Sequence, residues 1–211
     1  MQAVSKAAPE VRSKAVPRVL AAVAVALLLA LAIAAATLVA GSPSFHATTY
    51  EPPAPARDFT LTDHTGGTTS LSDLRGKPVL LFFGYTHCPD VCPMTLSLLR
   101  DALRQAGAGP EEVSVLLVTV DPARDTPEIL ARYVERYAPY VTGLTGSEAE
   151  IQQLLSAYGI HAEGGHEGHS GLLTHTSAVF GIDRDGMIRV LLRPEAPRDE
   201  FLADVKTLLE L

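Results

Sequence analysis

Between residues 57 and 211, blocks of apolar and polar positions predict strands and helices in alternation. Two continuous apolar runs, 78–84 and 113–120, are typical of strands buried on both faces of a sheet. Shorter or alternating runs predict further strands at 59–63, 141–144, 177–182 and 187–193. Apolar residues at helical spacing predict helices at 92–105, 127–137, 147–158 and 198–209.

Capping and turn residues mark several ends of these elements. Thr126 is followed by Pro127, and Ser147 by Glu150 three positions later, as in helix N-caps and capping boxes. Asp-Arg-Asp-Gly at 183–186 separates the last two strands, which predicts a hairpin. The order of elements predicts an α/β fold with a mixed sheet flanked by helices, and it fits a thioredoxin-like core with additions.

A different pattern precedes this domain. Residues 19–40 are uncharged and mostly apolar, long enough for one transmembrane helix. Residues 1–18 form a basic head, which predicts a cytoplasmic N-terminus and an extracytoplasmic domain at 57–211. Residues 41–56 are rich in Pro, Ser and Thr and read as a spacer. A signal peptide cleaved near residues 40–42 is the alternative, and it also exports the domain.

The charge distribution narrows the classes of partner. Residues 1–18 carry a net charge of +3, and with −7 for the whole chain the segment 41–211 carries −10. An acidic domain lacks the basic footprint of a nucleic-acid binder. Its net negative charge also does not favour binding to an anionic membrane surface.

The two cysteines of the chain, Cys88 and Cys92, follow the buried strand 78–84 and open the next helix. Their i, i+4 spacing puts both sulfurs on one side of the first helical turn. The free N–H groups and partial positive charge of a helix N-terminus favour thiolates. Both sulfurs are therefore expected to be more ionised than a free cysteine. The plain alternative is a pair of buried cysteines or a passive disulfide.

Two thiolates are an incomplete metal site. Soft thiolate ligands select Cu(I), zinc or iron–sulfur clusters. The chain has too few cysteines for a cluster and no Cys/His spacing of a structural zinc site. Copper accepts two sulfurs and one nitrogen, so the missing ligand is expected to be a histidine.

Seven histidines compete for that position. His175 stands just before the predicted hairpin, in the loop that faces the cysteine turn of a thioredoxin-like fold. His87 adjoins Cys88, but a neighbouring side chain in an extended segment points elsewhere. His175 is therefore the preferred candidate. The Gly-rich stretch 161–169 holds three histidines and reads as a solvated loop, with weak copper or zinc binding as the alternative.

Four segments carry a resemblance to a known family. They are GKP at 76–78, FGYTHCPDVCP at 83–93, VDPARDTP at 120–127, and His175-Thr ahead of VFGID at 179–183. Over roughly residues 57–210 the chain resembles the Sco/SenC proteins, membrane-anchored copper-binding proteins that help to assemble cytochrome c oxidase. The apolar segment and the spacer match the usual layout of that family.

The resemblance implies that Cys88, Cys92 and His175 bind copper, as Cu(I) or Cu(II). It implies delivery to the dinuclear copper centre in the copper-binding subunit of the oxidase, with other copper chaperones as further partners. Some members of the family instead reduce the cysteines of that centre. Many relatives carry Asp directly before the ligand histidine, whereas this chain has Thr174. A carboxylate there orients or tunes the imidazole, so its absence bears on affinity.

Residues 121–127 follow the second buried strand, at the sheet edge where α/β proteins gather their sites. Asp121, Arg124 and Asp125 are predicted to contact a partner or to hold the copper loop. A local ion pair that caps the next helix is the alternative.

Three functions compete on this evidence. The first is a copper metallochaperone, in which reversible Cys88–Cys92 disulfide formation switches delivery. The second is an extracytoplasmic thiol–disulfide oxidoreductase that acts on partner cysteines through the same pair. Its usual motif has two intervening residues, and this chain has three. A peroxiredoxin-like peroxidase is third, because Cys88 lacks a clear arginine partner.

Overall fold

The computed structural model describes residue 20 and residues 23–32, 44–160 and 177–211. They fall into two units, Met1–Ser44 and Phe45–Leu211. In the first unit residues 23–32 are helical. No helix within the described residues is long and apolar enough to cross a membrane. The basic head 1–18 and half of the predicted anchor 19–40 lie outside the described residues.

The described part of the second unit is built on one mixed sheet of eight strands in the order β1-β8-β7-β4-β5-β6-β2-β3. Among these described strands β4–β5 and β5–β6 pair in parallel, and the other neighbouring pairs are antiparallel. The strands span Thr48–Pro55 (β1), Thr60–Asp63 (β2), Thr68–Ser70 (β3), Val79–Gly84 (β4), Ser114–Thr119 (β5), Val141–Thr145 (β6), Val179–Ile182 (β7) and Met187–Leu192 (β8).

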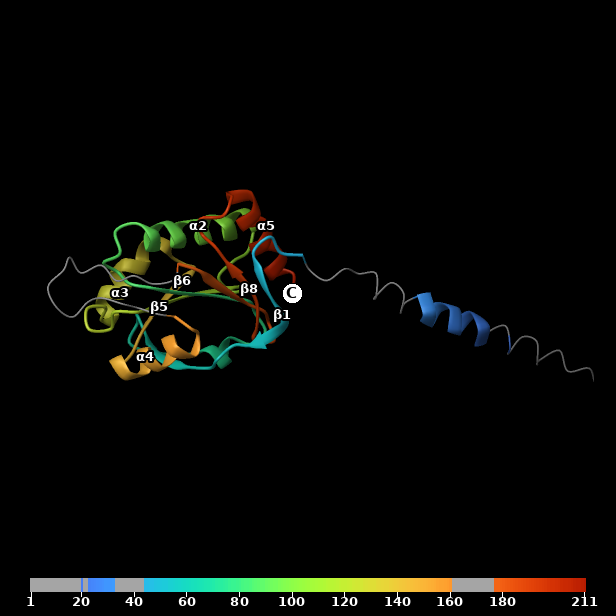
Figure 1. Cartoon of the computed structure of the whole chain (residues 1–211), viewed down its shortest axis with the longest axis horizontal. Helices are drawn as coiled ribbons and strands as arrows, with labels where there is room; N and C mark the ends of the chain where they lie inside the picture. Colours follow the sequence, from blue (N-terminus) through green and yellow to red (C-terminus); the bar gives the residue numbers. More distant parts are fainter. Residues whose placement is uncertain (1–19, 21–22, 33–43, 161–176) are drawn as a thin grey trace, which may run out of the picture. The chain divides into compact units, whose positions relative to one another are not determined.

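Helices cover both faces of the sheet. They span Val91–Ala106 (α2), Pro127–Val134 (α3), Glu148–Ala157 (α4) and Arg198–Leu209 (α5), with short 3₁₀ turns at Leu71–Leu74 (η1) and Glu135–Tyr137 (η2). Figure 1 shows α2 and α5 on one face and α4 on the other. A β4–α2–β5 unit followed by β7–β8–α5, in sheet order β8-β7-β4-β5, is the thioredoxin-like core. The predicted fold of this domain is therefore confirmed.

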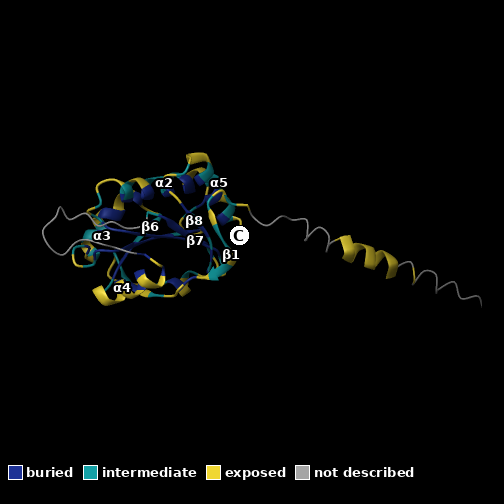
Figure 2. Ribbon diagram, in the orientation of Figure 1, coloured by how far each residue is buried: buried dark blue, intermediate teal, exposed yellow. Residues whose placement is uncertain are grey.

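The core lies along the central strands. All six residues of β4 are buried, because helices cover both faces of this part of the sheet (Figure 2). On α2 the buried side chains recur at helical spacing, as in Leu96, Leu99 and Leu103. Thus the continuous apolar run becomes the central strand, and the periodic run becomes a helix with one buried face.

The predicted helix boundaries are confirmed at two N-termini. The Thr126 hydroxyl accepts the N–H of Ile129, and Ser147 and Glu150 form a reciprocal capping box. One helix is shorter than expected. The predicted helix 127–137 is α-helical only to Val134 and then tightens into the 3₁₀ turn η2.

The predicted spacer 41–56 differs from the structure in its described part. Thr48–Pro55 forms β1, which pairs with β8 at the edge of the sheet, and the compact unit begins at Phe45. Its prolines are unusual in a strand, and they made the sequence typical of a spacer. Pro52 and Pro53 fall within the register shift between Thr49 and Ala54, where no ladder N–H is needed.

A buried carboxylate fixes the start of this unit. Asp204 of α5 accepts the backbone N–H groups of His46 and Ala47 at 2.7 and 2.8 Å. His46 Nδ1 lies 3.1 Å from the same carboxylate. Because Asp204 is only 2% exposed, these donors replace the water that its charge has lost. The segment that leads into β1 is thereby attached to the last helix.

We predict that Asp204→Asn lowers the free energy of unfolding by about 1–3 kcal/mol, since an amide offers one acceptor oxygen and no charge to these donors. Denaturant titration measures the change. Asp199→Asn on the exposed side of the same helix is the matched control and is expected to change little. Equal effects of the two variants would contradict a structural role for Asp204.

Candidate functional site

Two parallel strands end side by side and create the site. Gly84, the last residue of β4, pairs with Thr119, the last residue of β5. The N–H of Val120 donates to the carbonyl of Gly84 at 2.8 Å, just beyond the ladder. The two segments predicted to carry chemistry, 85–92 and 120–126, therefore leave the sheet at the same edge.

Asp125 joins these two segments. Its carboxylate is fully buried and accepts the N–H of Thr86 at 3.0 Å and the Thr86 hydroxyl at 2.5 Å. It also accepts the hydroxyl of Thr119 at 2.6 Å, at the end of β5. One carboxylate thus ties the turn before the cysteines to the neighbouring strand. Thr86 and Thr119 were missed by the sequence analysis, because their role depends on a partner 39 or 6 residues away.

Asp121 and Arg124 lie in the same segment but make a different contact. The Arg124 guanidinium pairs with the carboxylate of Asp121 three residues earlier. The N–H of Asp121 donates to the Thr119 hydroxyl at 2.9 Å. Asp125 thus bonds to the cysteine loop, while Asp121 and Arg124 form a local ion pair. Thr126, not this pair, caps α3. Their contact with a partner stays a prediction.

The cysteines occupy unlike environments at the start of α2. Cys88 is partly exposed, whereas Cys92 is fully buried in the first helical turn. The N–H of Cys92 points at the Cys88 sulfur across 3.5 Å. Gly84 makes room for the buried sulfur, because a Cβ at that position would lie 3.0 Å from Cys92 Sγ. The predicted placement of both thiols at one helix N-terminus agrees with this geometry.

The two thiols ionise differently. Partial burial opposes ionisation of Cys88. Hydrogen bonds to its sulfur outweigh this effect, and they come from the N–H groups of Cys92, Asp90 and Val91 and from the Cys92 thiol. The pKa of Cys88 is therefore lowered. Burial raises the pKa of the Cys92 thiol far above its ordinary value, although the N–H of Tyr85 works in the opposite direction. The expectation that both sulfurs are more ionised than a free cysteine is thus wrong for Cys92, whose desolvation outweighs the helix N-terminus.

The histidines divide between described and undescribed residues. His87 is half exposed, and its Nδ1 lies 3.0 Å from the Thr86 hydroxyl and 3.8 Å from the Asp125 carboxylate. His175 and the stretch 161–169 lie outside the described residues. Within the described part of the chain, no three His, Cys, Asp or Glu side chains are grouped to hold a metal ion. The described site therefore supplies two sulfur donors, and the predicted third ligand stays a prediction.

The start of β7 shows at which edge the chain enters the sheet after the histidine-containing segment. Val179, the first residue of β7, pairs with Phe82 of β4, two residues before Gly84. Because this pairing is antiparallel, β7 starts at the edge where β4 ends. The described residues 177–178 thus lead into the sheet at the edge from which the cysteine loop departs.

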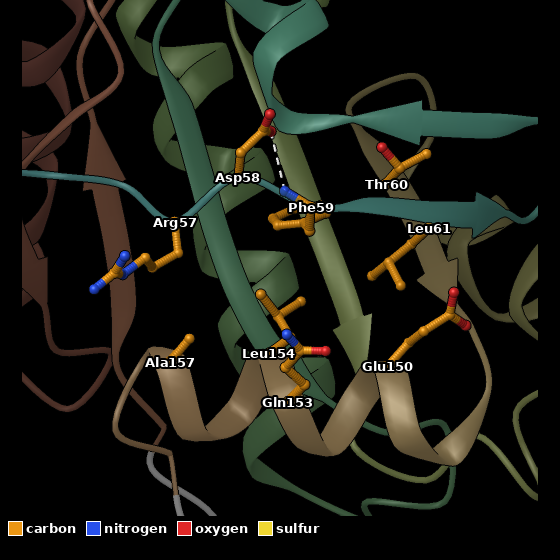
Figure 3. A pocket seen from close by; sticks show the side chains of 9 residues that line it. All are labelled: Arg57, Asp58, Phe59, Thr60, Leu61, Glu150, Gln153, Leu154 and Ala157. Atoms are coloured by element: carbon orange, nitrogen blue, oxygen red, sulfur yellow. Dashed lines mark hydrogen bonds between the residues drawn. The ribbon is translucent and has the colours of Figure 1, made fainter.

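A separate pocket of about 380 Å³ lies between residues 57–61 and α4 (Figure 3). Arg57, Asp58 and Glu150 are among the residues that line it. The Asp58 carboxylate already accepts hydrogen bonds from the backbone N–H groups of Phe59 and Ser72. Among the described residues, no cysteine or histidine lines the pocket, so these residues offer no soft metal ligand there.

Comparison with known proteins supports one family. The family model SCO1/SenC matches residues 47–210. The Bos taurus protein "Protein SCO2 homolog, mitochondrial" is 41% identical over 134 residues, which are 62% of this chain and 50% of that protein. This chain spans about half the length of the mammalian SCO2 homologues it matches.

Two solved structures share the fold over most of their length. Bradyrhizobium japonicum ScoI, solved with copper bound, is 36% identical to this chain, with a TM-score of 0.65. The match covers 72% of this chain and 98% of the ScoI chain. The solution structure of apo Sco1 from Thermus thermophilus is 34% identical with a TM-score of 0.64, covering 79% and 95%. Both likenesses support the thioredoxin-like core described above.

We predict that Cys88 is the more reactive thiol at neutral pH. In Cys92→Ser, which keeps a donor beside Cys88, iodoacetamide alkylation is expected to rise with pH through a midpoint below about 8.5, the value of a free cysteine. In Cys88→Ser, the buried and protonated Cys92 is expected to react more slowly than a free thiol. The same assay in denaturant is the control, because unfolding removes both environments. Faster alkylation of Cys92 than of Cys88 in the folded protein would contradict this order.

Proposed function

The chain belongs to the SCO1/SenC family, and from this premise we propose that it is a copper metallochaperone that carries copper on Cys88, Cys92 and His175. The observation that carries the proposal is the pair of sulfurs at the start of α2. One is partly exposed and receives helix N–H groups, and the other is buried beside it. Copper is the cargo of this function, and the protein's work is to hold it and release it.

The donor set fits a soft, weakly coordinated ion. Thiolates favour Cu(I), and two sulfurs with one imidazole leave the ion in a low-coordinate site. Cys92 carries a proton in the metal-free protein, so binding the ion displaces that proton. Bradyrhizobium japonicum ScoI, which shares this fold, was solved with copper bound, and this likeness supports the same cargo here.

His175 completes the proposed ligand set. It stands four positions before Val179, where β7 enters the sheet beside the end of β4. That edge is also where the cysteine loop departs. The proposal therefore puts residue 175 near the two sulfurs, because three residues separate it from Val179.

The proposed recipient is the copper-binding subunit of cytochrome c oxidase, with other copper chaperones as further partners. This step comes from the family, whose members help to assemble that enzyme. The partial exposure of Cys88 suits transfer, because an incoming ligand reaches the ion from that side. The acidic balance of 41–211 favours a partner with a basic docking patch, and it affects the rate of encounter more than the affinity.

A membrane anchor is the proposed role of residues 19–40. The proposal rests on their apolar sequence and on the basic residues before them. In this arrangement residues 1–18 stay in the cytoplasm and the domain works on the outer side of the membrane. There, oxidants reach Cys88 and Cys92, and a disulfide between them abolishes two of the three ligands.

The two thiols differ in exposure and in pKa, and this difference favours a second function, thiol–disulfide exchange. The Cys88 thiolate attacks a partner disulfide, forms a mixed disulfide and releases one partner thiolate. Cys92 then loses its proton and attacks Cys88, which yields the Cys88–Cys92 disulfide and a reduced partner. An exposed nucleophile with a lowered pKa and a buried second thiol suit this sequence.

We predict that the reduced protein binds one Cu(I) and that His175→Ala weakens the affinity by at least about 100-fold. Loss of an outer hydrogen-bonding partner alone typically costs about 10–100-fold, and a ligand is expected to cost more. Anaerobic titration against a chromophoric chelator measures the affinity. His87→Ala is the matched control, since its ring contacts Thr86 and Asp125. Tight binding that is indifferent to His175 would remove it from the ligand set.

For the second function, we predict that Cys92→Ser traps a mixed disulfide with an oxidised test peptide, because the resolving thiol is absent. Cys88→Ser is expected to trap none, since the remaining thiol is buried and protonated. Non-reducing electrophoresis and mass spectrometry detect the adduct. Efficient exchange by the wild type together with no competitive Cu(I) binding would favour the oxidoreductase over the metallochaperone.

A further inference from the structure

Gly84 ends β4 at a position where the backbone does not require glycine. It pairs with Thr119 of β5 in a regular parallel ladder, and its carbonyl accepts the N–H of Val120 at 2.8 Å. Gly84 is not among the described glycines with a positive φ. Any L-residue adopts such an extended conformation, so the reason for a glycine here lies in the space around it.

Side chains from two strands and one helix fill that space. A Cβ at residue 84 would lie 2.9 Å from Phe82 Cε1, 3.0 Å from Cys92 Sγ and 3.1 Å from Leu117 Cδ1. Non-bonded carbon atoms at their best separation are about 3.5–4.0 Å apart. All three neighbours are 0% exposed. A methyl group at residue 84 therefore displaces at least one of them within a closely packed interior.

The sulfur is the neighbour whose displacement matters for chemistry. Phe82 and Leu117 belong to the two central strands, whereas Cys92 lies in the first turn of a helix that follows a loop and yields more readily. A cysteine side chain has one torsion, so its sulfur moves by a change of rotamer or together with the helical turn. Either movement changes its position relative to Cys88, whose sulfur lies 3.5 Å from the Cys92 nitrogen.

We propose that Gly84 is a positioning residue of the copper site, because its missing side chain lets the Cys92 sulfur lie against the end of β4. The inference rests on the proposed function and adds a residue to it. Restoring an ordinary contact with a Cβ moves the sulfur by about 0.5–1 Å. Functional sites require their groups to be held to within about 0.5 Å, so this displacement lowers the affinity for the ion that both sulfurs bind.

The experiment compares Gly84→Ala with wild type in the full-length protein in detergent. Gly143→Ala is the matched control. Gly143 is a buried glycine of β6, where a Cβ would lie 3.2 Å from side-chain atoms of Leu130 and Val134 and has no sulfur among its nearest neighbours. Anaerobic competition with a chromophoric chelator measures Cu(I) affinity, and denaturant titration measures metal-free stability.

We expect both alanine variants to lower the metal-free unfolding midpoint, because both crowd a packed interior. Only Gly84→Ala weakens Cu(I) binding, by about 10–100-fold, the range for residues that orient metal ligands. In a Cys88→Ser background, Gly84→Ala also speeds alkylation of Cys92 by iodoacetamide, since the sulfur has left its buried position. Gly143→Ala changes neither the Cu(I) affinity nor the alkylation rate.

A double-mutant cycle with Cys92→Ala tests the contact without copper. When the sulfur is absent, a methyl group at residue 84 meets one neighbour fewer. The fall in unfolding midpoint caused by Gly84→Ala is therefore expected to be smaller in the Cys92→Ala background. The cycle also covers a Gly84→Ala protein that fails to fold, because the variant with both substitutions is then expected to fold.

Three outcomes would overturn the inference. One is a folded Gly84→Ala with the Cu(I) affinity and Cys92 alkylation rate of wild type. Another is an equal loss of affinity in Gly143→Ala, which would assign the effect to general destabilisation. The third is an absence of coupling in the cycle, or a variant with both substitutions that fails to fold, since the resistance would then come from Phe82 and Leu117. Failure of the wild type to bind Cu(I) would instead refute the proposed function, and the role of Gly84 in copper binding with it.

Discussion

The parallel pairing of β4 with β5 is the constraint on which the site depends. It ends both strands at one level, with Gly84 opposite Thr119, so two segments about 35 residues apart in sequence leave the sheet together. The fully buried carboxylate of Asp125 then joins them through Thr86 and Thr119. The position of the sulfurs is therefore set by the sheet and by one anion.

The same junction explains why the two cysteines differ. Chain direction at the end of β4 carries residue 88 outward, and the first turn of α2 then carries residue 92 back against Gly84. Cys88 meets free N–H groups and solvent, while Cys92 meets the core. At Cys92 burial raises the pKa more than the helix N-terminus lowers it, because a buried thiolate loses its hydration. A single motif thus yields one ionisable sulfur and one protonated sulfur.

Much of the fold was predictable because its signals are local. The apolar run of β4, the periodicity of α2 and the capping box at Ser147 each depend on a few neighbouring residues. The edge strand β1 was not, since its pairing with β8 joins residues more than 130 positions apart. The motifs indicated the two thiols and a site at 121–125, because both are short segments of sequence. They did not reveal that Asp125 bonds to the cysteine loop or that Cys92 is desolvated, because both depend on contacts between distant segments.

Under the proposed function, the difference between the two sulfurs would also reconcile holding copper with releasing it. A site with two exposed sulfurs would exchange its ion with any thiol, and a site with two buried sulfurs would exchange it with none. Under the proposed function, the buried sulfur would gain its full charge only with the metal and would contribute to retention. The partly exposed sulfur would be the one that a partner's ligand reaches first. In that case release would begin at Cys88, and Cys92 would hold the ion longest.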